Sequence, residues 1–288
     1  MVDGVAYWIA VWSKSEAGLK NIGGTRRWSS VLGREVWIAA GGFAALTIAL
    51  TYPQIRFMQS QVGLHYDALF SVWRLAWIAH QVPHDPLHLF DANIFYPALK
   101  TLAYSDALLL PGLIGAPLVW IGVHPVLVHN LLIVLSFVGS GVAMYILVRT
   151  VTGSVWAAWF SGAVFAFQPY RFAHYSQLEL LWGWWIPLAL WALHRMFTHH
   201  RVRDGALLGL FVALQAWSCI YYAVFLVTAV AVVTVVMACG WSRSQIVGLV
   251  KPAIAAALVC GIFVGPYAVP YVQAQSTVNT RSESEIRE

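Results

Sequence analysis

The sequence predicts an all-α fold: a polytopic transmembrane helix bundle of about seven spans, with a long outer first loop that carries interfacial helices. Composition is the first reason, because 60% of the residues are apolar and 10% are charged, against roughly 45–50% and about 25% in soluble domains. The second is one long polar interval, Gln54 to Asp106, between two apolar segments, where a simple connector would need only a few residues. The third is the set of 15 tryptophans and 12 tyrosines, which suits aromatic belts at a membrane interface.

The apolar segments predict the spans in chain order. A straight helical span needs roughly 20 residues, so the shorter segments must extend at their ends into neighbouring aromatic residues. The predicted spans are Val36–Tyr52, Pro125–Val148, Val155–Phe167, Leu178–Phe197, Gly205–Ser218, Tyr221–Ala238 and Leu249–Val269.

The segment Ala107–Val123 is apolar enough to cross a membrane, but prolines and glycines interrupt it repeatedly. Basic residues favour the cytoplasmic side of a membrane, and they gather in residues 1–35, at Arg149 and from His194 to Asp204. All three groups can face the cytoplasm only if Ala107–Val123 does not span. We therefore expect this segment to be re-entrant or interfacial.

Charge also divides the chain into parts. Residues 1–35 are predicted to be a cytoplasmic basic leader, residues 36–272 a transmembrane module with the outer loop 54–124, and residues 273–288 an outer tail. The basic residues lie in short clusters beside the spans, so membrane topology explains the net charge of +5. Charge therefore gives no reason to expect a nucleic-acid partner.

Four short phrases carry a resemblance to a known family. They are Asp67-Ala-Leu-Phe-Ser-Val-Trp-Arg-Leu-Ala-Trp, Asn93-Ile-Phe-Tyr-Pro, Leu102-Ala-Tyr-Ser and Ala166-Phe-Gln-Pro-Tyr-Arg171. With their order along the chain, they resemble the polyprenyl-phosphate-sugar-dependent glycosyltransferases of the GT-C superfamily, and bacterial GT-C-like membrane proteins in particular. The resemblance covers most of the chain from Val36 onward. It implies a multi-pass protein of the bacterial inner membrane with a cytoplasmic N-terminus, and an N-terminal core module of a longer protein.

The resemblance implies a transferase that moves a sugar from a polyprenyl-phosphate carrier to a glycan, lipid or protein acceptor at the outer face of the membrane. Such a transfer needs a base near the acceptor hydroxyl, cations on the departing phosphate and a groove for the polyprenyl tail. The alternative is a non-catalytic membrane protein that binds or translocates a lipid-linked glycan through the same groove. No cofactor is predicted for either function, with a divalent metal as the weaker alternative, and membrane lipids are partners in both.

Asp67 is the candidate catalytic base. It follows the first span after a short polar link and opens an amphipathic run, Leu69 to His80, that contains Trp73 and Trp77. The spacing of that run suits a helix lying in the membrane interface, with the two tryptophans on the bilayer or on the outer ends of the spans. In the GT-C pattern the catalytic acid lies in this first outer loop. An Asp before such a helix is equally a common N-cap, so both roles stay open.

Further along the loop, Asp91 and Asn93 form a polar pair that is a candidate for binding substrate. Their separation by one residue would allow them to share a divalent cation, but Asx residues before a turn are common, so no metal site is predicted. Tyr104, in the phrase Leu102-Ala-Tyr-Ser, is a further substrate-binding candidate. Asp106 precedes an apolar helix and is predicted to act as a helix cap.

The second outer element, Gln168 to Gln177, contributes Arg171 and His174. A guanidinium matches phosphate oxygens in geometry and charge, so Arg171 is predicted to bind the lipid phosphate; an interfacial anchor is the alternative. Glu179 begins the next apolar segment, where a carboxylate is costly unless paired. It would pair with Arg171, transfer a proton or stabilise a helix N-terminus.

Two adjacent tyrosines complete the substrate-binding candidates. Tyr221 and Tyr222 lie at a predicted outer turn between two spans. They are expected to line the acceptor groove, or else to belong to the interfacial aromatic belt.

Overall fold

A computed structural model describes residues 25–63 and 66–278 of the chain. Every regular element in these residues is helical, so the all-α class is confirmed for them. The elements are α2 (Thr25–Leu50), α3 (Gln54–Phe57), α4 (Tyr66–His84), η1 (Pro86–His88), η2 (Thr101–Tyr104), α5 (Leu109–Trp120), α6 (Pro125–Thr152), α7 (Val155–Ala166), α8 (Pro169–Ala173), α9 (Leu178–Leu181), α10 (Trp185–His199), α11 (Val202–Ser218), α12 (Ile220–Ala238) and α13 (Arg243–Val278). Most of the basic leader and the last ten residues of the predicted tail lie outside the described residues.

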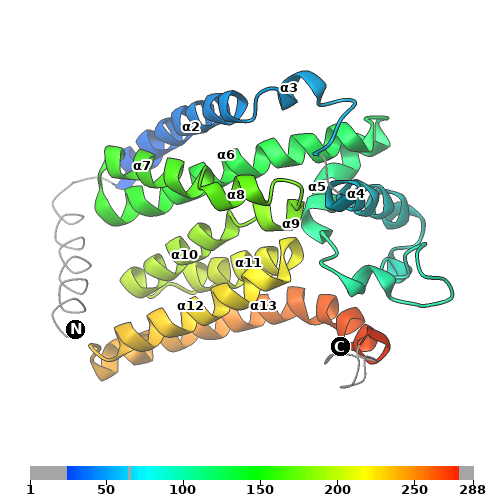
Figure 1. Cartoon of the computed structure of the whole chain (residues 1–288). Coiled ribbons are helices and arrows are strands. Elements are labelled where there is room, and N and C mark those ends of the chain that lie inside the picture. The colour runs from blue at the N-terminus through cyan, green and yellow to red at the C-terminus, as the bar shows by residue number, and fades with distance from the viewer. Residues whose placement is uncertain (1–24, 64–65, 279–288) are drawn as a thin grey trace, which may run out of the picture.

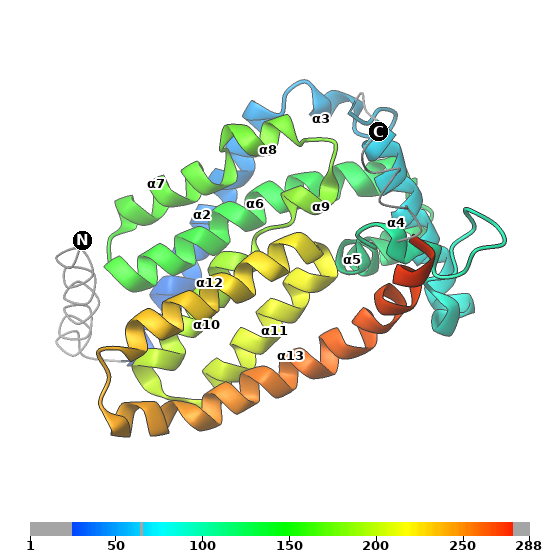
Figure 2. The same ribbon diagram turned by 60° about the horizontal axis from the view of Figure 1, so that its bottom comes forward.

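The long helices run between two ends of the molecule (Figures 1 and 2). At one end, called the α4 end below, lie α3, α4 and α5. At the other end, called the turn end, lie the turns that join α6 to α7, α10 to α11 and α12 to α13. The long polar loop and the basic stretch from His194 to Asp204 therefore lie at opposite ends of the bundle, as their charges predict.

Four helices in the described part of the chain are long and apolar enough to cross a membrane, judged by length and composition. They are α2 from Gly33 to Leu50, α6, α12, and α13 from Arg243 to Gln275. The remaining predicted spans form shorter helices, of 12 residues in α7, 15 in α10 and 17 in α11. Four of the predicted spans are therefore candidate membrane-spanning helices, and the bundle of about seven spans stays a prediction.

One predicted span is not a continuous helix. Within Leu178–Phe197, α9 ends at Leu181 and α10 begins at Trp185. Gly183 lies in the break, and Pro187 stands in the first turn of α10. Proline lacks an amide hydrogen and is tolerated near a helix start but not inside a helix. The sequence therefore favours a new helix at this point over the continuation of α9.

The ambiguous segment Ala107–Val123 forms the short helix α5. Its 12 residues correspond to about 18 Å of helix, less than the roughly 30 Å of a bilayer core. One side of α5 packs on α4, and a Cβ added at Gly112 would collide with the side chain of Ile78. Helix α7 has the same number of residues, so length does not distinguish the two, and the non-spanning position of α5 stays a prediction from charge.

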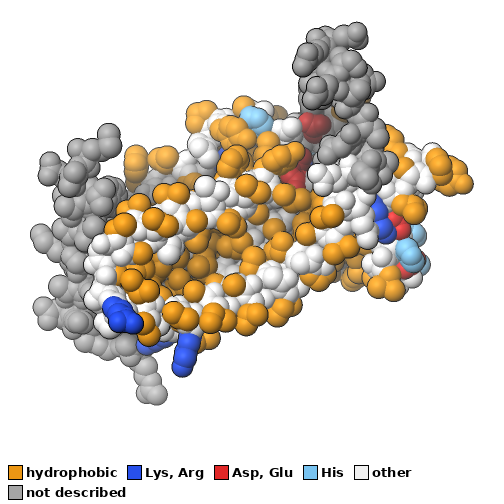
Figure 3. Space-filling model, turned by 90° about the horizontal axis from the view of Figure 1, so that it is seen from below, with side chains coloured by type: hydrophobic (Ala, Val, Ile, Leu, Met, Phe, Trp, Pro, Cys, Tyr) orange, Lys and Arg blue, Asp and Glu red, His pale blue; other side chains and the backbone are white. Residues whose placement is uncertain are grey.

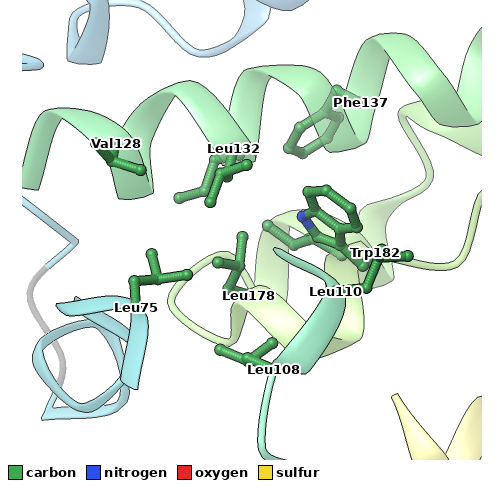
Figure 4. Packing of buried hydrophobic residues seen from close by; sticks show 10 residues of the cluster. Leu75, Leu108, Leu110, Val128, Leu132, Phe137, Leu178 and Trp182 are labelled. Carbon is green, nitrogen blue, oxygen red and sulfur yellow. The ribbon is translucent and has the colours of Figure 1, made fainter. Parts of the chain in front are cut away.

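A buried hydrophobic cluster connects the α4 end to the long helices (Figure 4). Leu75 of α4, Leu110 of α5 and Phe137 of α6 meet Leu178 and Trp182 at α9. Helices in a membrane gain little from leaving lipid, so their association relies on close packing of this kind. The cluster fixes the positions of α4, α6 and α9, which carry the charged residues described below.

The helices α11 and α13 come into direct backbone contact at two glycines. A Cβ at Gly205 would overlap the carbonyl oxygen of Pro252, and one at Gly209 would overlap that of Ala256. Residues four apart share a helix face, and small residues at this spacing allow membrane helices to approach closely. This contact ties α13 to the bundle along one side.

Candidate functional site

A buried ion pair joins α4 to α9 at the α4 end. The side chain of Arg74 is 1% exposed, and its Nη2 lies 2.9 Å from Oε2 of Glu179. The same nitrogen donates to Oγ of Ser71 at 2.9 Å, and Nη1 donates to the carbonyl oxygen of Asp106. The guanidinium also lies 4.4 Å from the centre of the Phe70 ring. We call Ser71, Arg74, Asp106 and Glu179 the Arg74 cluster.

The Asp106 carboxylate binds the start of a distant helix. Its Oδ1 accepts a hydrogen bond of 2.9 Å from the amide of Ile220, the first residue of α12. The prediction that Asp106 caps the helix following it is therefore wrong: α5 has no side-chain cap, and Asp106 instead binds the first amide of α12. Asp106 is 5% exposed and its Oδ2 has no hydrogen-bond partner among the described residues. Burial, reinforced by the charge of Glu179, raises the pKa of this carboxyl above its usual range.

The segment around Asp106 is also fastened to α13. The amide of Ala107 donates to the hydroxyl oxygen of Tyr271 at 3.0 Å, and that hydroxyl donates to the carbonyl oxygen of Ser105 at 3.3 Å. The hydroxyls of Tyr267 and Tyr271 lie 2.9 Å apart. Four helices thus make polar contacts with the Arg74 cluster or with the residues beside Asp106: α4, α9, α12 and α13.

A second buried arginine lies between α8, α6 and α12. Arg171 is 2% exposed, and its Nη2 donates to the carbonyl oxygen and Oγ of Ser136 at 3.2 and 3.4 Å. Its guanidinium lies 4.7 Å from the centre of the Phe137 ring. Nε of Arg171 has no hydrogen-bond partner, and no carboxylate forms an ion pair with it, within residues 25–63 and 66–278. Burial lowers the pKa of Arg171 to about 10.

The pairing of Glu179 with Arg171, one of three roles considered for that acid, is wrong. Glu179 pairs with Arg74, a residue 105 positions away in the chain. Because the chain breaks between α9 and α10, α9 does not continue the axis of α10, and Glu179 can reach Arg74 on α4. Arg171 is left with neutral partners in the described part of the chain.

The candidates near Arg171 differ in exposure. Tyr222 lies close enough to act on the charge of Arg171, and its hydroxyl donates to the carbonyl oxygen of Leu180 at 3.1 Å. His174 stacks on Tyr170 with ring centres 4.1 Å apart. Tyr221 precedes Tyr222 but turns outward and is 67% exposed. Only Tyr222 of the adjacent tyrosines therefore joins the surroundings of Arg171.

Comparison with models of known protein families, with curated proteins and with solved structures gives no match to this chain.

Asp67 is the second residue of α4 and is half-buried. A carboxylate in the first turn of a helix interacts favourably with the helix dipole. Because α4 begins at Tyr66, Asp67 lies inside the first turn and is not the N-cap, and its role as catalytic base stays a prediction.

The helix predicted after Asp67 is present, but a different side of it is buried. The buried residues are Ala68, Ser71, Arg74, Leu75, Ile78 and Ala79, while Leu69 is exposed. The indole nitrogens of Trp73 and Trp77 donate to Oδ1 of Asn93 at 3.1 Å and to the carbonyl oxygen of Leu89 at 2.8 Å. These tryptophans hold the following loop and pack against a buried cluster that includes Tyr267 and Ala274 of α13, which agrees with the predicted contact with the outer end of a span. Small residues on the buried face of α4 explain why that face, and not the tryptophan face, lies deepest, because they let α4 approach its neighbours.

The polar pair of the loop is occupied by contacts within the protein. Asp91 accepts from the backbone amide of Lys100 at 2.9 Å and pairs with its Nζ at 3.1 Å. Asn93 accepts from Trp73, and Tyr104 stacks on Phe95 with ring centres 5.9 Å apart. In residues 25–63 and 66–278, no three or more His, Cys, Asp or Glu side chains are grouped as metal ligands would be. These contacts hold the loop in shape. They do not test whether Asp91, Asn93 and Tyr104 contact substrate, which stays a prediction.

Arg74 and Asp106 were not predicted from the sequence to belong to a buried polar centre. One signal for Arg74 was present, since it shares a helix face with Ala68, Ser71 and Ile78 at spacings of three or four residues. An arginine on a face of small and apolar residues indicates a buried charge with a partner elsewhere. Nothing in the local sequence indicates that Asp106 reaches the start of α12.

Proposed function

We propose that this chain is the membrane module of a glycosyltransferase that takes a sugar from a polyprenyl-phosphate carrier, with its site at the α4 end. In this proposal α2, α6, α7, α10, α11, α12 and α13 are the spans, the N-terminus is cytoplasmic, and the α4 end faces outward from a bacterial inner membrane. The shorter helices reach across with the aromatic residues at their ends and with the protein around them.

One observation supports the proposal most: Arg171 is 2% exposed and has no ion pair with a carboxylate among the described residues. A buried charge without a partner costs several kcal/mol, and such a cost is commonly retained where a charge is needed for function. A phosphate would supply the missing negative charge and accept from the free Nε. Phosphate is also the group that a polyprenyl carrier presents at the membrane surface.

The chemistry assigns a role to each group. The Asp67 carboxylate takes the proton of the acceptor hydroxyl while the acceptor oxygen forms a bond to the anomeric carbon of the sugar. The bond between that carbon and the phosphate oxygen breaks, and polyprenyl phosphate leaves with the electron pair. Arg171 stabilises the leaving phosphate, with His174 and Tyr222 beside it. The ion pair between Arg74 and Glu179 holds α4, and so Asp67, against α9.

The experiment compares turnover and donor binding in two variants, in membranes with a polyprenyl-phosphate sugar. Asp67→Asn should lower turnover by roughly 10²–10⁴ and leave donor binding nearly intact. Arg171→Lys keeps a charge but loses the planar fork, so it should weaken both donor binding and turnover. Asp85→Asn, an exposed change in the same loop, is the matched control and should leave both unchanged. Wild-type turnover in Asp67→Asn would remove Asp67 from the mechanism.

The second candidate is a non-catalytic protein that binds or translocates a lipid-linked glycan. Glu179 forms an ion pair with Arg74, and Asp91 forms one with Lys100. Either acid would have to break its ion pair before it could act as a base, which favours a non-catalytic function. This function predicts that Asp67→Asn retains full transport or binding, while Arg171→Lys loses it. The same two variants therefore separate the two functions.

A further inference from the structure

The acidic side chains that the structure describes at the turn end, Glu35 and Asp204, are engaged by two arginines. Oε2 of Glu35, in α2, lies 2.9 Å from Nε of Arg149 in α6. Oδ1 of Asp204, in α11, lies 2.8 Å from Nε of Arg195 in α10. Each ion pair joins two helices, so these four charges neutralise one another within the bundle.

A second set of basic side chains at this end stands exposed. Within residues 25–63 and 66–278 these side chains form no ion pair with a carboxylate. The set, called the basic rim below, is Arg34, Arg201, Arg203, Arg243 and Lys251.

Contacts between helices place the basic rim at one end of the bundle. Trp191 of α10 donates to Oγ1 of Thr150 in α6 at 3.1 Å, close to the Glu35–Arg149 pair. The rings of Phe197 and Trp241 lie 4.8 Å apart, which joins the end of α10 to the turn before α13. A Cβ at Gly248 would touch His200, so the first turns of α13 lie against the α10–α11 turn.

The surface beside the basic rim is apolar. Figure 3 shows the side formed by α12 and α13, where hydrophobic side chains cover the middle and Lys and Arg side chains stand at one end; no acidic side chain of the described residues is visible beside them in this view. At the opposite end of the same view, basic, acidic and His side chains occur together. Both helices are long and apolar enough to cross a membrane. Their ends at the α12–α13 turn therefore belong near a headgroup layer.

We propose that the basic rim binds the headgroups of anionic phospholipids in the leaflet next to the turn end. The phosphate of a zwitterionic lipid is balanced by its own cation, whereas phosphatidylglycerol carries a net negative charge that five exposed cations attract. Lys and Arg reach the headgroup layer while their alkyl stems stay on apolar surface. The Glu35–Arg149 and Asp204–Arg195 pairs keep carboxylates from repelling the lipid. This inference does not depend on sugar transfer.

The test measures binding of phosphatidylglycerol and phosphatidylcholine to the purified chain in neutral detergent, by lipid titration with native mass spectrometry. Each basic residue near an anionic surface is worth roughly fivefold in affinity, so Arg201→Gln/Arg203→Gln/Arg243→Gln should weaken phosphatidylglycerol binding by about a hundredfold. Phosphatidylcholine binding should be weak and unchanged. Raising the salt concentration should reduce the preference of the wild type, because exposed charges are screened.

Two controls make the result decisive. Arg56→Gln removes an exposed arginine at the α4 end and should change phosphatidylglycerol binding less than Arg203→Gln does. Soluble glycerol phosphate, which has the charge but no acyl chains, should not displace the lipid at equal concentration. Equal binding of both lipids by the wild type, equal effects of Arg56→Gln and Arg203→Gln, or displacement by glycerol phosphate would each overturn the proposal.

Discussion

The two ends of the bundle use arginine in opposite ways. At the α4 end, Arg74 and Arg171 are withdrawn from the surface, at 1% and 2% exposure. At the turn end, the basic rim is exposed and the acids are engaged with Arg149 and Arg195. The same residue type therefore serves as a buried structural or ligand-binding charge in one region and as a surface charge in the other. How strongly each arginine affects the free energy of unfolding therefore depends on how deeply its side chain is buried.

Within the α4 end the two buried arginines also differ from each other. Arg74 has a carboxylate, a hydroxyl and a carbonyl as partners. Arg171 has a carbonyl, a hydroxyl and the face of Phe137. A paired buried charge contributes to the fold only while its partner remains, whereas an unpaired one costs stability until a ligand arrives. Four experiments, in order of expected effect, test this difference and the contrast between the two ends.

The largest effect should come from breaking the paired charge. Arg74→Met leaves Glu179 largely buried without its cation and should lower the free energy of unfolding by about 3–5 kcal/mol. Denaturant titration in detergent micelles measures the change. Arg74→Met/Glu179→Leu removes both charges and should recover most of the loss. A double variant no more stable than Arg74→Met would show that packing, and not the ion pair, is responsible.

Removing the unpaired charge should act in the opposite direction. Arg171→Met replaces a buried guanidinium with an apolar side chain and should raise the stability of the ligand-free protein by about 0.5–2 kcal/mol. Polyprenyl phosphate should stabilise the wild type and leave the variant unchanged, because a ligand stabilises only the form that binds it. Thermal unfolding with and without the lipid measures both effects. A variant less stable than the wild type and still stabilised by the lipid would contradict the phosphate role.

Asp106 should give the wild type a pH dependence that Asp106→Asn lacks. Its pKa is raised from 3.8 by burial, so the folded form holds the proton more tightly than the unfolded form. That contribution to stability is complete below pH 3.8 and is lost as pH rises through the raised pKa. Asparagine keeps an oxygen for the Ile220 amide and does not titrate. Melting temperatures of both proteins should therefore be measured from pH 4 upward, and that of the wild type should fall relative to that of the variant as pH rises. Parallel plots of melting temperature against pH would count against a raised pKa.

The smallest effect should come from the turn end. Arg203→Gln removes an exposed charge with no ion pair to a described carboxylate and should change the free energy of unfolding by less than about 0.5 kcal/mol in neutral detergent. The same titration used for Arg74→Met provides the comparison. A loss approaching that of Arg74→Met would abolish the contrast between the two ends.

Much of the fold follows from local patterns. Apolar segments predicted the four long helices, prolines and glycines predicted an interrupted segment at Ala107–Val123, and basic residues predicted two chemically different ends. These features depend on the residues within one helix or one loop. The break after α9 was missed, although Gly183 and Pro187 mark it, because hydropathy alone does not register a change of helix direction.

The amino-acid sequence by itself determined the helical class, the sites of the long apolar helices, and the presence of acids and arginines in the polar elements. Only the tertiary structure decided which of them meet: Glu179 finds Arg74 across 105 residues, Asp106 caps a helix 114 residues away, and Arg171 keeps no carboxylate among the described residues. Helix formation depends on neighbours three or four residues apart, which any single sequence displays. Pairing of distant charges depends on how helices pack against one another, through shape and small residues such as Gly205 and Gly209, and local patterns do not specify it.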